Sequence, residues 1–158
     1  MKRCNRILRT PAYIRAMEEN KRYDAGRKFC GHDMNHLLDT ARIGYLMILE
    51  QELAIPKEII YAAALLHDAG RFKEDEGQCH DLASARLAAD ILPGCGFEPE
   101  EIQQITEAIA GHREPAHDGG SLTDILYRAD KLSRRCWECP VSEECNWPEE
   151  KKNHLLEL

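Results

Sequence analysis

The chain has 158 residues, of which 43% are hydrophobic and 31% charged, a balance that indicates one globular domain with a substantial core and excludes a disordered chain. Its formal net charge of -7 disfavours a general nucleic-acid-binding protein, although a nucleotide substrate stays allowed because a bound metal cation can invert the local field. With no apolar run of about 18 residues and no secretory signal, we expect a cytoplasmic protein without a membrane segment, whose seven cysteines are reduced thiols or metal ligands.

The first half of the chain predicts three amphipathic helices. Thr10-Pro11 has the pattern of a cap followed by proline in the first turn, so a helix should follow it. A second helix is expected from His32-Asp33 onward, because apolar residues then recur at helical spacing up to Leu49. Pro56 opens a third, strongly apolar helix, which we expect to stop at Gly70.

The second half predicts three more helices and no clear strand. An alanine-rich helix should cover residues 81–92 and close at Pro93-Gly94. Pro99 opens the next helix. Ser121 and Asp124 resemble a capping box at the start of the last main helix, with aspartate in the acidic place.

His67-Asp68 ends the apolar helix that follows Pro56. An unpaired buried carboxylate is costly, so Asp68 should be paired or bind a metal; the alternative is a helix end that simply emerges into solvent. His36 lies early in the second helix, and Asp130 lies beside the apolar face of the last one. These four residues form a mixed nitrogen and oxygen set, which suits iron, manganese or another first-row divalent metal.

The order His36, His67-Asp68, Asp130 resembles the H…HD…D signature of the HD superfamily, over residues 30–135. The resemblance implies an all-α fold, a compact HD-domain bundle of about six to seven helices. It also implies a metal-dependent phosphohydrolase in which these four residues bind the first metal. Residues 1–158 would then form a single HD domain, with a cysteine-containing C-terminal tail at residues 136–158.

His80 and His112 occupy the places where two-metal HD enzymes carry two extra histidines, between the HD pair and the final aspartate. On this resemblance, both would bind a second metal and Asp68 would bridge the two ions. The segment 80–134 is similar to the bacterial HD hydrolases of symmetrical dinucleoside tetraphosphates. The alternative makes each an ordinary surface or helix-terminal histidine. Three histidines have no matching place in the family pattern and are expected at the surface: His32, His117 and His154.

Arg71 follows the Ala69-Gly70 turn, where many HD proteins carry a basic residue. It is expected to act with Asp68 in catalysis by binding a substrate phosphate, while metal-activated water attacks phosphorus; the alternative is a solvated arginine without a role at the site. Lys131, beside Asp130, is another candidate for phosphate binding. Two polar loops, 71–78 and 114–120, are either solvated connectors or the rim of a substrate site.

Cys136, Cys139 and Cys145 form a C-x2-C-x5-C pattern, and three thiols this close in a cytoplasmic protein indicate a metal. They are one ligand short of a tetrahedral sulfur site. Cys30 precedes His36 by six residues, and Cys136 follows Asp130 by six. If the helices of His36 and Asp130 run antiparallel, both cysteines lie on the same side of the metal at a similar distance, which favours Cys30 as the fourth ligand. The alternatives are a non-cysteine group or one of Cys4, Cys79 and Cys95.

The spacing of these cysteines resembles the cluster-binding tail of iron–sulfur DNA-repair glycosylases. This resemblance implies a four-iron–four-sulfur cluster, but zinc is equally allowed by ligand type. Three unconnected reduced thiols in the C-terminal tail are the remaining alternative.

The sequence as a whole favours hydrolysis of a phosphate ester or anhydride of a small, nucleotide-like substrate by metal-activated water. No nucleic-acid polymer and no membrane is expected as a partner, and the oligomeric state stays open. One alternative is an HD-fold di-iron oxygenase, because such enzymes use the same ligand pattern. The other is a non-catalytic redox or metal-sensing module that works through the cysteines.

Overall fold

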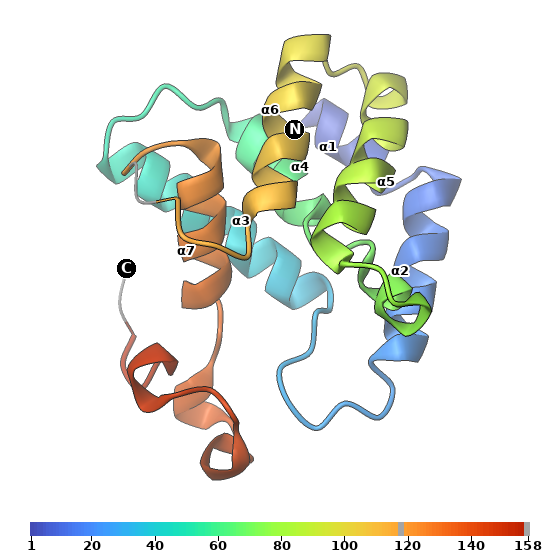
Figure 1. Cartoon of the computed structure of the whole chain (residues 1–158). Helices are drawn as coiled ribbons and strands as arrows, with labels where there is room; N and C mark the ends of the chain where they lie inside the picture. The colour runs from blue at the N-terminus through green and yellow to red at the C-terminus, as the bar shows by residue number, and fades with distance from the viewer. Residues whose placement is uncertain (117–118, 157–158) are drawn as a thin grey trace.

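The structure is a computed structural model that describes residues 1–116 and 119–156, and within these ranges the chain is helical without a strand (Figure 1). The all-α prediction is therefore confirmed. The α-helices are α1 (Lys2–Ile7), α2 (Pro11–Tyr23), α3 (Met34–Glu50), α4 (Lys57–Leu66), α5 (His80–Cys95), α6 (Pro99–Gly111) and α7 (Leu122–Leu132). The short 3₁₀ helices are η1 (Arg71–Glu76), η2 (Cys136–Glu138), η3 (Ser142–Glu144) and η4 (Glu149–Lys151). Across the described ranges, no helix has both the length and the apolar character needed to cross a bilayer.

Side chains cap the helix starts that the sequence indicates. The Thr10 hydroxyl accepts a hydrogen bond from the Tyr13 amide at the start of α2. The Asp33 carboxylate accepts from the amides of Asn35 and His36, which fixes the first turn of α3. The Ser121 hydroxyl accepts from the amide of Asp124 in α7. These caps satisfy amides that have no partner inside the helix and so define where each helix begins.

The predicted end of the alanine-rich helix at Pro93-Gly94 is wrong. Pro93 lies inside α5, which runs to Cys95 and ends at Gly96, a glycine with φ +86°. The left-handed conformation at Gly96 stops the helix, whereas one proline near its end removes only a single backbone donor. The predicted loop 71–78 is also more ordered than expected, because most of it forms η1.

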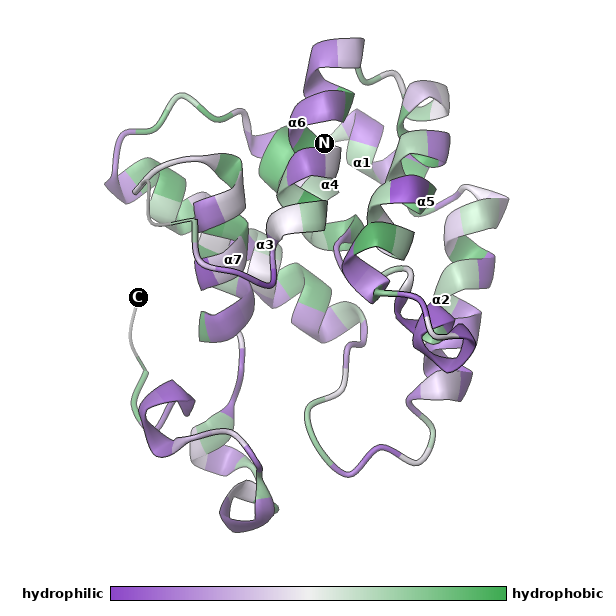
Figure 2. Cartoon of the chain, viewed as in Figure 1, coloured by the Kyte–Doolittle hydropathy of each residue, from purple (hydrophilic) through white to green (hydrophobic). Residues whose placement is uncertain are grey.

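Helix α4 occupies the centre of the bundle and is coloured mainly as hydrophobic in Figure 2. Most of its side chains are buried, and it packs against α1, α3, α5, α6 and α7. A helix that is apolar on nearly every side needs neighbours all around it. This packing places His67 and Asp68, at the C-terminal end of α4, where other helix ends meet.

Gly70 lets α5 approach the turn that follows α4. Its amide donates to the Ser84 hydroxyl at 2.9 Å. A Cβ at Gly70 would lie 2.5 Å from the Ser84 backbone nitrogen, a distance that real Cβ contacts do not show. The close approach brings the first turn of α5, with His80, next to Asp68.

Candidate metal centre

Four histidines from four helix ends surround the carboxylate of Asp68. One oxygen, Oδ2, lies 3.3 Å from His67 Nε2 and 3.7 Å from His36 Nε2. The other oxygen, Oδ1, lies 3.4 Å from His80 Nε2 and 3.7 Å from His112 Nε2. The carboxylate therefore faces one pair of histidines with each of its oxygens, as a bridging ligand would.

Asp130 of α7 completes the first of these groups. Its Oδ1 atom lies 3.4 Å from His36 Nε2 and 3.8 Å from His67 Nε2. The Lys131 ammonium lies 2.5 Å from the other carboxylate oxygen and orients it. The structure thus brings together the predicted first group, and His80 and His112 stand on the opposite side of Asp68. Each half contains three ligand atoms within 4.8 Å of one another, in the sets His36, His67, Asp68 and Asp68, His80, His112.

The outer nitrogens of two of these histidines are fixed by backbone carbonyls. His67 Nδ1 donates to the carbonyl of Ala64 at 2.8 Å, and His112 Nδ1 donates to the carbonyl of Ile109 at 2.6 Å. A carbonyl only accepts, so the proton of each neutral ring lies on Nδ1. The Nε2 lone pairs are then left facing the centre, which is the arrangement of metal-binding histidines.

The other two histidines are held by side chains that the sequence analysis did not identify. His36 Nδ1 lies 3.0 Å from the Ser133 hydroxyl, which in turn donates to the carbonyl of Asp130 at 2.8 Å. His80 Nδ1 lies 2.5 Å from a carboxylate oxygen of Glu74. Ser133 and Glu74 therefore play the same orienting role as the two carbonyls.

The donor set fits a cation. The Nε2 atoms of His36 and His67 are 3.3 Å apart, and the carboxylates of Asp68 and Asp130 lie beside both. Lone pairs and negative oxygens this close in a buried site repel one another unless a positive charge lies between them. Imidazole and carboxylate ligands together suit a first-row divalent metal.

The pKa values of the buried groups follow from the same crowding. Burial lowers the pKa of His67, but the charges of Asp68 and Asp130 overcome it and raise the pKa to about 10. Burial raises the pKa values of both carboxyl groups, yet His67 holds each well below its usual range. Burial, followed by the nearby charge of His67, lowers the pKa of His112 to about 4. Without a metal, a proton on His67 therefore supplies the positive charge that the carboxylates require.

The prediction that His32 lies at the surface is wrong. Its side chain is only 14% exposed, and its Nε2 atom lies 3.7 Å from Asp68 Oδ2. Burial lowers the pKa of His32 to about 4. His32 precedes α3 in a loop, where helical spacing says nothing about orientation. His154 is exposed as predicted, and the prediction for His117 lies outside the described residues.

Asn20 of α2 holds the backbone of the His67-Asp68 turn. It is buried, its amide nitrogen donates to the Asp68 carbonyl at 2.9 Å, and its amide oxygen accepts from the Phe72 amide at 2.9 Å. The sequence contained one indication of this role. Asn20 shares the buried face of α2 with Tyr13 and Ala16, where a polar side chain needs a partner.

A pocket of about 360 Å³ opens above the ligands. Its lining includes the basic residues Arg27, Arg71, Arg113, Lys131 and Arg134. Arg71 is 6% exposed and its guanidinium lies 3.5 Å from Glu74, but its Nε atom has no hydrogen-bond partner among the described residues. Within a chain of net charge -7, these side chains give the mouth of the site a local positive charge suited to an anion.

The predicted cysteines line a different pocket. Cys30 lies in the loop before α3, whereas Cys136, Cys139 and Cys145 lie beyond α7. The argument from equal helical offsets is wrong, because neither Cys30 nor Cys136 lies on the α-helix from which its offset was counted. The four residues nevertheless line one cavity.

Three comparisons relate the chain to known proteins. The HD domain family matches residues 34–135 of the chain. An uncharacterized protein of Clostridium beijerinckii is 42% identical over 157 residues, which cover 99% of each chain. The crystal structure of a predicted HD superfamily hydrolase from an uncultured Thermotogales bacterium has a similar fold. Its TM-score is 0.65 at 24% identity, and the match covers 89% of this chain and 79% of that chain.

Proposed function

Because this chain belongs to the HD domain family, we propose that it is a metal-dependent phosphohydrolase that cleaves a phosphate ester or anhydride of a small, nucleotide-like substrate. One observation carries the proposal. Both oxygens of Asp68 face pairs of histidine Nε2 atoms at the base of a pocket with a basic rim. Such an arrangement suits two cations at the base of the pocket and a phosphate group at its basic rim.

Two divalent transition metals, iron or manganese, are the proposed cofactors. The first would be held by His36, His67, Asp68 and Asp130, and the second by Asp68, His80 and His112. Bound there, the metals would lower the pKa of a water molecule and neutralise charge on the phosphoryl oxygens. The chain itself supplies the orientation, since Ser133 and Glu74 fix two ligand rings and Lys131 fixes Asp130.

The pocket also supports the proposed substrate class. Its volume of about 360 Å³ suits a small molecule, and Trp147 lines it together with Arg134, whose guanidinium lies 4.0 Å from the centre of the indole ring. Phosphate groups would be attracted by the basic rim, and a base could stack near the indole. A dinucleoside polyphosphate is the specific candidate that we would test first. The seven free thiols support a reducing, cytoplasmic location.

A metal-reconstituted phosphatase panel tests the proposed function. The chain is stripped with a chelator and reloaded with Fe²⁺ or Mn²⁺. It is then assayed on phosphate monoesters, nucleotides and dinucleoside polyphosphates under anaerobic conditions. We expect phosphate or nucleotide release that needs the metal and does not need oxygen. Turnover that consumes oxygen would instead support an oxygenase, and a fully loaded protein without hydrolysis of any panel member would contradict the proposal.

Arg71 is expected to bind substrate phosphate. Replacing Arg71 with alanine should lower kcat/KM about 10- to 100-fold, mainly through KM, because a charged hydrogen-bonding partner is lost. Arg71→Lys should recover only part of this loss, since lysine lacks the planar fork of donors. Arg128→Ala is the matched control, because Arg128 pairs with Asp124 outside the pocket. Equal loss in both alanine variants would contradict a specific role for Arg71.

A further inference from the structure

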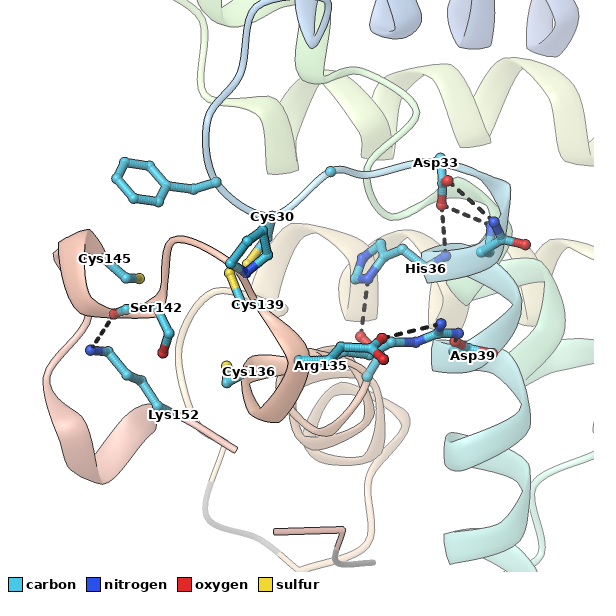
Figure 3. Close-up of a pocket in the computed structure, with 16 residues that line it drawn as sticks. Cys30, Asp33, His36, Asp39, Arg135, Cys136, Cys139, Ser142, Cys145 and Lys152 are labelled. Carbon is cyan, nitrogen blue, oxygen red and sulfur yellow. Dashed lines mark hydrogen bonds and ion pairs between the residues drawn. The ribbon is translucent and has the colours of Figure 1, made fainter. Parts of the chain in front are cut away.

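Four cysteines that lie far apart in the sequence meet around one hollow. Cys30, Cys136, Cys139 and Cys145 all line one pocket of about 430 Å³, which Figure 3 shows in close-up. Cys30 comes from the loop between α2 and α3, and the other three come from the segment after α7. The hollow is therefore a junction between two irregular parts of the chain.

The C-terminal segment has no hydrophobic core of its own. From residue 134 to residue 156 no hydrophobic side chain is buried, and η2, η3 and η4 each contain only three residues. The segment nevertheless has defined turns that present its thiols: the amide of Cys139 donates to the carbonyl of Cys136, and that of Cys145 donates to the carbonyl of Ser142. Short structures without a core usually need a cross-link or a metal to be stable.

The spacing of the thiols indicates which kind of metal centre fits. A single zinc ion, with Zn–S bonds of about 2.3 Å, would draw its four sulfurs to about 3.8 Å from one another. Among the described residues, no cysteine belongs to a group of three ligand atoms within 4.8 Å, although the histidine and aspartate ligands form two such groups. Four thiols that surround a cavity at larger spacing fit a bigger ligand than one ion.

We propose that Cys30, Cys136, Cys139 and Cys145 bind a four-iron–four-sulfur cluster in this pocket. Four cysteine thiolates are the usual ligands of such a cluster, which is larger than a single metal ion. The thiolates and the cluster together carry net negative charge. Lys152 and Arg135 line the same pocket. Both already pair with carboxylates, Lys152 with Glu149 and Arg135 with Asp39, so they offset that charge only in part.

The cluster would act on the metal centre through position. His36 lines both pockets, and Ser133, which holds the outer nitrogen of His36, lies three residues before Cys136. Asn153 further fixes the segment, because its side chain donates to the carbonyls of Lys131 and Arg134 at the end of α7. A cluster that joins Cys30 to Cys136 would therefore fix the loop before His36 relative to the segment that carries Ser133.

The decisive measurement is acid-labile sulfide, because the histidine and aspartate centre contains none. The full chain is reconstituted anaerobically with Fe³⁺, sulfide and a thiol that reduces part of the iron to Fe²⁺, then desalted. We expect about four sulfides per chain and a broad visible absorption that dithionite bleaches. Bound zinc with no sulfide would overturn the proposal, whatever the outcome of the phosphatase panel.

Variants test the identity of the ligands. Cys30→Ser and Cys139→Ser should each lose most of the sulfide, whereas Cys79→Ser should keep it, because Cys79 lies in the loop before α5 and does not line this pocket. Circular dichroism of each variant reports whether the helices remain. If Cys30→Ser keeps both its helices and the full sulfide content, the assignment of Cys30 is wrong. If the wild-type chain holds no sulfide, the whole proposal falls without reference to any variant.

Discussion

Replacing Asp68 with asparagine is expected to remove bound metal from both halves of the centre and to abolish hydrolysis. Both carboxylate oxygens face histidine Nε2 atoms, and among the described residues only Asp68 belongs to both ligand groups. An amide keeps the shape of the side chain but offers only one oxygen and no charge. Even residues that merely orient a ligand cost 10- to 100-fold when mutated, so we expect a loss of at least about 100-fold in kcat.

Metal analysis and turnover should be measured on the same Asp68→Asn sample. Asp90→Asn is the matched control, because Asp90 is an exposed aspartate on α5, away from the pocket. The control should keep both metals and full activity. Normal turnover in Asp68→Asn would show that the carboxylate does not bridge two sites and would remove the main support for a two-metal centre.

The fold was largely predictable because local signals and helical periodicity agree. Thr10, Asp33 and Ser121 cap the helices that follow them, and Pro99 opens α6. The error at Pro93 has a simple cause: a proline near the end of a helix disturbs only one hydrogen bond, and the conformation of Gly96 sets the true end. Where two possible helix ends lie this close in sequence, here Pro93-Gly94 and Gly96, the packing around the last turn decides between them.

The residues that meet at the candidate site could be picked out in the sequence because their residue types are costly in apolar surroundings. His67 and Asp68 follow a run of alanines and leucines, so the sequence by itself indicates a special role for them. The residues that hold the ligands were harder to find. Glu74, Ser133 and Asn20 are ordinary polar residues in sequence, and their roles depend on contacts between elements far apart in the chain.

His32 and Cys30 illustrate the limit of arguments from spacing. Both lie in the loop between α2 and α3, where no helical period relates sequence distance to direction. His32 turns toward Asp68, against expectation. Cys30 lines the same pocket as the three C-terminal cysteines, but it does so from a loop and not by the helical offset that suggested it. The path of a loop follows from tertiary contacts, here with α2 on one side and the C-terminal segment on the other.

Replacing His112 with alanine is expected to reduce the metal content from two ions per chain to one and to remove most of the turnover. His112 contributes one of the two imidazoles that face Asp68 Oδ1, so the second group loses a third of its ligand atoms while the first stays intact. The carbonyl of Ile109 also loses a hydrogen bond, which should cost about 1–3 kcal/mol of stability without unfolding the bundle.

His112→Asn separates the two effects of the His112 change, because an amide nitrogen can donate to the carbonyl of Ile109 as the ring does, while the Nε2 ligand is absent. We expect His112→Asn to regain stability but neither the second metal nor turnover. His154→Ala is the matched control, since His154 is an exposed histidine that contacts only Glu149 among the ion pairs of the described chain. Thermal unfolding, metal content and kcat should be measured on all three variants. Full activity with one metal in His112→Ala would mean that the first group works alone and that His80 and His112 serve only to position Asp68.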